Sequence, residues 1–158
     1  MLRLLSAGAF ALVCGVSTAG AQVAVDDVRI QIFGERSGSF SENLVGSRKV
    51  LKNTVRGEGD AGEPAEQVLV TLVFTGPKNS RSSDKIARDL ASVTVTQSAK
   101  TGPRTLLKRA YGGFQFGESG RYHKAFMLDN ATCAPLEVEV RLGRSRRTVK
   151  VDFTCDDA

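Results

Sequence analysis

The most constraining feature of this sequence is a series of short segments in which apolar side chains recur at every second position. Val28 to Ile32 alternates strictly, and the same period returns over residues 92–96, 136–142 and 149–153. Successive side chains of an extended strand point to opposite faces of its sheet. Each segment is therefore predicted to be a strand with one apolar face and one polar face.

Other segments add strands of different character. Residues 68–74 are almost continuously apolar, which is typical of a central strand that is covered on both faces. A weaker alternation at Leu51 and Val55 and a polar-rich run over residues 104–111 predict two more strands. Within residues 75–91, Ile86 and Leu90 are spaced by four, so one short helix of about two turns is expected there.

These segments lie close together along the chain and are separated by turn residues, among them many of the 16 glycines. This organisation predicts an all-β fold, an antiparallel β-sandwich of about seven to nine strands with one short helix. A closed barrel is the alternative architecture. Residues 22–158 are expected to form this single β-sandwich domain, since the length suits one core.

The last two strands are predicted to form a hairpin whose register follows from parity. Val138 and Val140 share one face, as do Val149 and Val151, so an antiparallel pairing must join even numbers to odd ones. Pairing Val140 with Val149 satisfies this rule and leaves residues 143–146 as a four-residue loop.

Residues 118–124 read Glu-Ser-Gly-Arg-Tyr-His-Lys and resemble the D-S-G-x-Y-x-C stretch of immunoglobulin-like sandwiches. The resemblance implies an immunoglobulin-like fold in which Tyr122 enters a late strand and closes a corner by bonding to the backbone. Lys124 stands where that family has a cysteine, and the chain contains no tryptophan.

The N-terminal residues follow the pattern of a secretory signal. Arg3 precedes an apolar run from Leu4 to Val16, and the small residues Ala19, Gly20 and Ala21 follow it. Residues 1–21 are therefore predicted to be a cleaved signal peptide, which implies a periplasmic or extracellular location. A membrane anchor and lipidation at Cys14 are the alternatives. No transmembrane segment is expected in the mature chain.

Two cysteines remain after removal of the signal, Cys133 and Cys155. Thiols of an exported protein meet an oxidising compartment, so these two are predicted to form a disulfide. A redox-active or metal-binding pair is the alternative. It would favour a close Cys-x-x-Cys or further His ligands, and His123 is the only histidine.

Candidate binding residues are of two kinds. Arginines cluster around the last hairpin, and their planar forks suit anions; they are Arg141, Arg144, Arg146 and Arg147. A flexible acidic loop is a weaker candidate for Ca²⁺, although its spacing does not match a known calcium loop; its carboxylates are Glu58, Asp60, Glu63 and Glu66. No other metal site and no cofactor are expected. No nucleic-acid partner is expected either, because aromatic residues do not interleave with the basic ones.

The sequence thus favours a secreted or periplasmic, non-enzymatic binding or interaction domain, whose partner is an unknown protein or an anionic surface polymer. Its structural alternative is an accessory component of a cell-envelope assembly. An enzyme is the third possibility, and its site would consist of carboxylates, Lys or Tyr. No catalytic residue is assigned, because no nucleophile motif surrounds His123.

Overall fold

The computed structural model describes residues 23–47, 50–52, 54, 60–82, 90–99 and 102–155. The alternating segments of the sequence all form strands within these ranges. Seven are long: β1 (Ala24–Gly34), β4 (Val68–Thr75), β6 (Ala91–Ala99), β7 (Gly102–Tyr111), β9 (Arg121–Leu128), β10 (Leu136–Leu142) and β11 (Ser145–Val151). Five have two residues each: β2 (Ser39–Phe40), β3 (Leu51–Lys52), β5 (Ser80–Arg81), β8 (Gln115–Phe116) and β12 (Phe153–Thr154).

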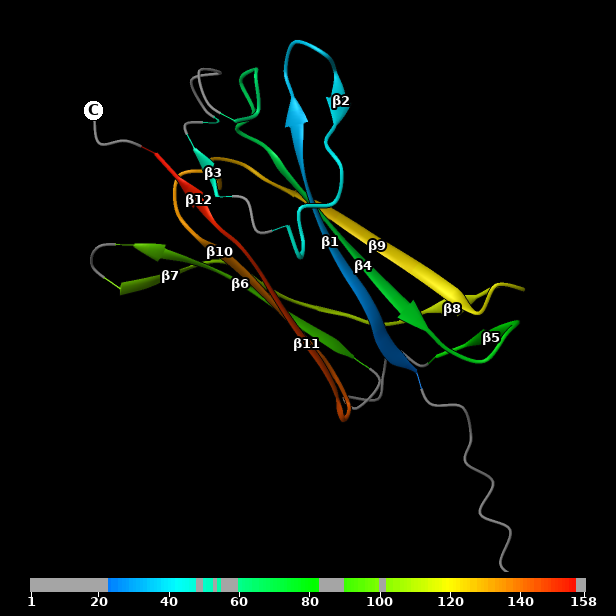
Figure 1. The fold of residues 1–158 in the computed structure, drawn as a ribbon. Helices are drawn as coiled ribbons and strands as arrows, with labels where there is room; N and C mark the ends of the chain where they lie inside the picture. The colour runs from blue at the N-terminus through cyan, green and yellow to red at the C-terminus, as the bar shows by residue number, and fades with distance from the viewer. Residues whose placement is uncertain are drawn as a thin grey trace, which may run out of the picture.

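The long strands form two antiparallel sheets that face each other (Figure 1). One sheet has the order β2-β1-β4-β9, and the other has the order β11-β10-β6-β7. In chain order the seven long strands correspond to A, B, C, C′, E, F and G of an immunoglobulin-like domain. The first sheet then reads A-B-E and the second G-F-C-C′. The predicted immunoglobulin-like sandwich is confirmed, and the sheets do not close into a barrel.

The core lies between the two sheets because each strand turns its apolar positions inward. Val28, Ile30 and Ile32 of β1 are at most 5% exposed, and Val70 on β4 lies opposite Ile30. Strand β4 pairs with β1 on one side and β9 on the other, which confirms residues 68–74 as a central strand. Full burial of one Val, Ile, Leu or Phe side chain stabilises the fold by about 1.5–3 kcal/mol.

The register of the last hairpin differs from the predicted one by two residues. Val138, not Val140, lies opposite Val149, and Leu142 lies opposite Ser145. The loop therefore contains only Gly143 and Arg144, and Gly143 has a φ of 56°. Two-residue turns with positive φ match the twist of the flanking strands, which explains why this tighter register is adopted. Parity was predicted correctly, since even residues pair with odd ones.

The C-terminal residues leave this hairpin and pair elsewhere. Strand β12 runs parallel to β3, with Phe153 opposite Leu51, and the Phe153 side chain is fully buried. Just beyond β12, Cys155 forms the predicted disulfide with Cys133, with a Cα–Cα distance of 4.7 Å. Cys133 lies in the connection between β9 and β10, so the disulfide fastens the end of the chain to the loop that precedes strand F.

The resemblance around Tyr122 does not extend to a tyrosine corner. Tyr122 lies on β9, which pairs with β4 and occupies position E, whereas the corner belongs to strand F. The ring of Tyr122 packs edge-on against Phe114, at 5.5 Å between centroids, and against Phe116 at 6.5 Å. It is thus part of an aromatic cluster at one end of the sandwich.

Some predictions fall on residues that the structure does not describe. These are the signal peptide, most of the short helix with Ile86, and Val55 of the weak strand. In the ranges that are described, no helix is long and apolar enough to span a membrane.

Candidate functional site

Three of the four predicted arginines lie close together, two on the outer face of the G-F-C-C′ sheet and one in the turn between β10 and β11. Arg141 on β10 lies directly opposite Arg146 on β11, and both side chains are more than half exposed. Glu139 accepts a hydrogen bond from each of them, one on either carboxylate oxygen. Arg144 is exposed in the turn between the two strands. We call Glu139, Arg141, Arg144 and Arg146 the arginine face.

Because Arg141 and Arg146 share the carboxylate of Glu139, the pKa values of groups in the arginine face are shifted. The hydrogen bond from Arg141, assisted by the one from Arg146, holds the pKa of Glu139 below its ordinary value. The reverse interaction raises the pKa of Arg141. A single carboxylate thus faces two guanidinium groups, and one positive charge remains in excess. Each guanidinium group has five N–H donors, and its bond to Glu139 uses one of them.

Arg147, the fourth predicted arginine, belongs to a different contact. It lies opposite Val140 and so on the inward face of β11, where it reaches strand β1 of the other sheet. Its Nη1 donates to the Asp26 carbonyl at 2.7 Å, and its Nη2 lies 3.4 Å from Oδ1 of Asp27. The Ser145 hydroxyl accepts a hydrogen bond from the Val25 amide at 3.1 Å. These contacts join the two sheets along the β1–β11 side.

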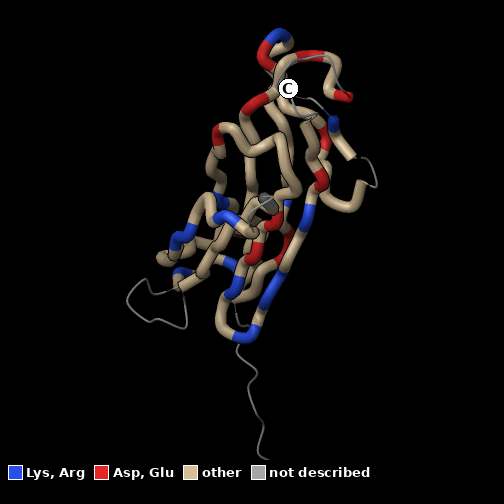
Figure 2. The backbone as a smooth tube through the Cα atoms, turned by 90° about the vertical axis from the view of Figure 1, so that its left-hand side faces the viewer, with Lys and Arg blue, Asp and Glu red and all other residues tan. Residues whose placement is uncertain are grey.

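Charge is distributed unevenly along the molecule. In Figure 2 the end that contains the β10–β11 turn is mainly basic, and the end near the C-terminus is mainly acidic. Acidic residues occur in the β1–β2 turn (Glu35), just after β2 (Glu42) and in the loop that precedes β4 (Asp60 and Glu63). The arginine face therefore lies at the basic end, where an anionic partner is attracted over a longer range.

The acidic loop has a structural role at Glu63. Its carboxylate accepts hydrogen bonds from the amides of Arg36 and Ser37, both at 2.8 Å, and from the Ser37 hydroxyl at 2.7 Å. These bonds, led by the one from the Ser37 hydroxyl, lower the pKa of Glu63. Of the four predicted calcium ligands, Glu58 lies outside the described residues. Within the described residues, no group of three or more His, Cys, Asp or Glu is arranged to hold a metal ion.

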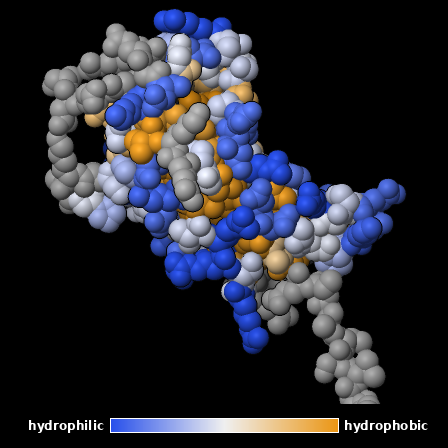
Figure 3. All heavy atoms as spheres, viewed as in Figure 1, coloured by the Kyte–Doolittle hydropathy of each residue, from blue (hydrophilic) through white to orange (hydrophobic). Residues whose placement is uncertain are grey.

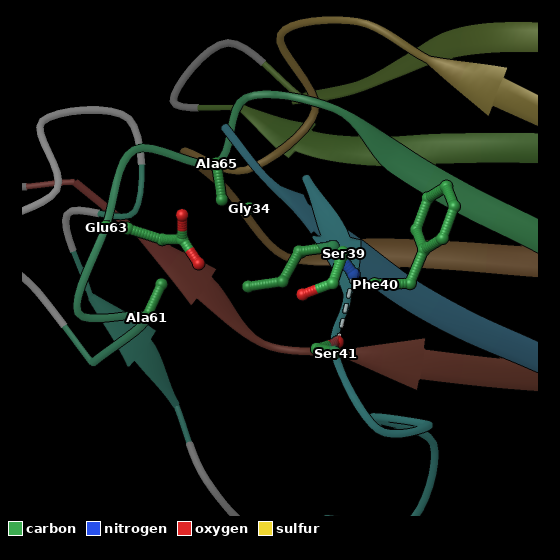
Figure 4. Close-up of a pocket in the computed structure, with 8 residues that line it drawn as sticks. Gly34, Ser39, Phe40, Ser41, Ala61, Glu63 and Ala65 are labelled. Atoms are coloured by element: carbon green, nitrogen blue, oxygen red, sulfur yellow. Dashed lines mark hydrogen bonds between the residues drawn. The ribbon is translucent and has the colours of Figure 1, made fainter. Parts of the chain in front are cut away.

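Two adjoining hollows lie beside this loop. The smaller, about 150 Å³, contains the Glu63 carboxylate next to Ala61 and Ala65, while the ring of Phe40 points away from it (Figure 4). The larger, about 480 Å³, is lined by apolar side chains and by two acidic residues. Its lining residues are Ile32, Ser41, Glu42, Leu44, Val50, Leu51, Asp60 and Ala61. Apolar surface is visible beside β3 and β12 in Figure 3.

The only histidine lies on the outer face of β9. His123 is exposed and sits opposite Val73 of β4. The next residue, Lys124, points to the inner face, where its Nζ lies 5.4 Å from the centroid of the Tyr111 ring. His123 is thus placed on an open sheet surface, remote from both hollows in the strand register.

Comparisons with known proteins identify no family. No family model matches the chain, and no curated protein matches it. Among solved structures, the chain is similar to an immunoglobulin-like protein from Pseudomonas aeruginosa, with 10% sequence identity and a TM-score of 0.42. The similarity covers 85% of this chain and 98% of the other. The strand order itself defines the fold as immunoglobulin-like.

Proposed function

We propose that this chain is an exported, non-enzymatic binding domain that recognises an anionic partner through the arginine face. The observation that carries this proposal is the placement of Arg141 directly opposite Arg146. Like charges at opposed positions of a sheet destabilise it, and one glutamate offsets this only in part. Residues that cost stability in this way are typical of binding surfaces.

Export is supported by two features together. The predicted signal peptide directs the chain out of the cytoplasm, and the Cys133–Cys155 disulfide suits an oxidising compartment. The location that we propose is the periplasm or the extracellular space. N-terminal sequencing of the secreted protein tests this, since cleavage after Ala21 would leave a chain that begins at Gln22.

The ligand chemistry that suits the arginine face is a group of carboxylate, sulfate or phosphate oxygens. Guanidinium groups donate paired hydrogen bonds to such oxygens. Ser92 and Thr94 of β6, opposite Arg141 and Glu139, continue the same outer face with hydroxyl groups. An acidic segment of another protein or an anionic surface polymer presents this chemistry. Poly-glutamate and dextran sulfate represent the two sources in an experiment.

The test compares two double variants on immobilised poly-glutamate and dextran sulfate at several salt concentrations. R141Q/R146Q removes the opposed arginines, and R29Q/R36Q removes the same charge from β1 and the turn that follows it. We expect R141Q/R146Q to weaken binding about tenfold, or about 1.4 kcal/mol, and R29Q/R36Q to change it by less than about twofold. Equal losses in both variants would show only a nonspecific charge effect and would overturn the proposal.

The second candidate function, an accessory component of a cell-envelope assembly, is favoured by one observation. Among the described residues, strand β9 is the last of its sheet and has β4 as its one neighbour, so its other edge can accept a further strand. Size-exclusion chromatography of a native extract separates the candidates, because an assembly component would elute with its partners.

A further inference from the structure

Strand β9 presents a free sheet edge. It is the last strand of its sheet, with β4 on one side and no strand on the other among the described residues, as Figure 1 shows for the yellow strand. Along such an edge, every second residue turns its N–H and C=O groups outward, where they can pair with another extended backbone. A β-strand is therefore the occupant that satisfies these groups.

The other long edge strands carry features that discourage pairing. Strand β7 contains Pro103, and its register with β6 shifts between Val95 and Thr96. It also carries exposed basic side chains at Arg104, Lys108 and Arg109. Strand β11 is joined to β1 by Ser145 and Arg147. Proline, bulges and charges are the usual protection of sheet edges.

Strand β9 lacks this protection over its second half. Ala125 to Leu128 contains no charge, no proline and no register shift. Met127 in this stretch is 40% exposed, one of the most exposed large apolar side chains described. The charged residues that flank this stretch are Lys124, which points inward, and Asp129, which lies beyond the end of the strand. Half of this edge is thus open to a partner strand.

We propose that β9 pairs with β9 of a second copy of this chain, antiparallel and centred on Ala125. The two A-B-E sheets then become one continuous sheet across a two-fold axis. Such a sheet keeps both cores on the same side only when even residues face even residues and odd face odd. Centring on Ala125 satisfies this condition, because Lys124 faces Phe126 and His123 faces Met127 of the other copy.

Charge favours this register over the one that is centred on Lys124. Centring on Lys124 would place Lys124 opposite the same residue of the second copy, and opposed like charges are destabilising. Centring on Ala125 places Arg121 opposite Asp129 of the second copy, on both sides of the axis. Both side chains are exposed. Within one copy, Arg121 lies 3.4 Å from Oδ2 of Asp26, and Oδ1 of Asp129 accepts a hydrogen bond from Gln67 at 2.9 Å. A guanidinium group has further N–H donors and a carboxylate has a second oxygen, so each can also take part in a contact between copies. The basic start of β9 and the acidic residue after its end therefore make the edge self-complementary.

The proposal concerns a different surface from the arginine face, which lies on the other sheet. It goes beyond the proposed function, and either can fail without the other. If both hold, the dimer presents two arginine faces, and an extended anionic polymer that spans both binds with avidity.

The experiment uses sedimentation equilibrium of the full mature chain and of variants at Ala125. The side chain of Ala125 is exposed, so A125K and A125E are compatible with the monomer fold. Each puts like charges on the two-fold axis, and we expect each to weaken dimerisation at least about tenfold. An equimolar mixture of A125K and A125E places opposite charges there and is expected to recover the dimer. This recovery also shows that both variants remain folded.

Matched controls are A110K and A110E, the same changes at an exposed alanine on the edge strand β7. They should leave the dimer unchanged. A wild-type chain that stays monomeric up to about 1 mM overturns the proposal and leaves the edge to a segment of another protein. Variants at Ala125 that dimerise as tightly as the wild type, or a mixture that fails to recover the dimer, overturn the pairing centred on Ala125.

Discussion

Ser37 and Glu63 are joined by two hydrogen bonds although they lie 26 residues apart in the sequence. The Ser37 amide donates to Oε2 of Glu63 at 2.8 Å, and its hydroxyl donates to Oε1 at 2.7 Å. This contact connects the turn of the β1–β2 hairpin to the loop that leads into β4. The Glu63 carboxylate, which this contact holds, also lines the smaller hollow (Figure 4).

The first prediction concerns the pH dependence of this contact. Because its hydrogen bonds lower the folded-state pKa of Glu63, the group stabilises the fold above its ordinary pKa of 4.5. That contribution is lost as the pH falls through the lowered folded-state pKa. We expect E63Q to be less stable than the wild type at pH 7 and the difference to shrink at acidic pH. Urea unfolding at several pH values measures it.

A suitable control for this experiment is E66Q, which changes the same side chain three residues further along the same loop. At pH 7 we expect E66Q to lose less stability than E63Q, because Glu63 joins two segments that are distant in the sequence. A stability difference for E63Q that is constant between neutral and acidic pH would contradict the role given to its carboxylate.

The second prediction concerns the disulfide between Cys133 and Cys155. It closes a loop of 22 residues and holds β12, with the buried Phe153, beside β3. Chain-entropy arguments give about 3 kcal/mol for a loop of this size. We therefore expect C133A/C155A to lose about this free energy of unfolding in urea. A loss below about 0.5 kcal/mol would mean that the tail stays docked without the bond.

Much of the fold can be predicted from the alternation of side chains, because the period of two assigns each strand its inner face. Parity alone cannot separate hairpin registers that differ by two residues, since both keep Val138 and Val149 on the same face. The positive φ of Gly143 and the resulting two-residue turn decide between them. Such a preference is encoded in the turn, not in the strands.

The candidate site could be predicted only in part. Sequence proximity groups four arginines, but Arg147 shares the parity of Val149 and Val151 and therefore faces inward. That signal was available in the alternation. The role of Glu139 depends on the hairpin register, and that of Glu63 depends on a contact between distant segments. Neither can be read from local spacing.

The third prediction tests the hairpin turn. Gly143 has a φ of 56°, a left-handed conformation that costs other residues about 1–2 kcal/mol. G143A is expected to lower the free energy of unfolding by about 1 kcal/mol, measured by urea denaturation. Asparagine tolerates this conformation better, so G143N should retain most of the wild-type stability. Equal stability of G143A and the wild type would indicate a different turn.

The fourth prediction concerns the close approach of Gly76 to the ring of Phe116. A Cβ atom at Gly76 would lie 2.6 Å from Cε2 of Phe116, and Phe116 is only 3% exposed. G76A should therefore lose about 1–3 kcal/mol through overpacking. F116L shortens the opposing side chain, so G76A should cost less in the F116L background, by at least about 0.5 kcal/mol in a double-mutant cycle. G117A is the control, since a Cβ there meets open space. Strict additivity of G76A and F116L would show that the two residues are not in contact.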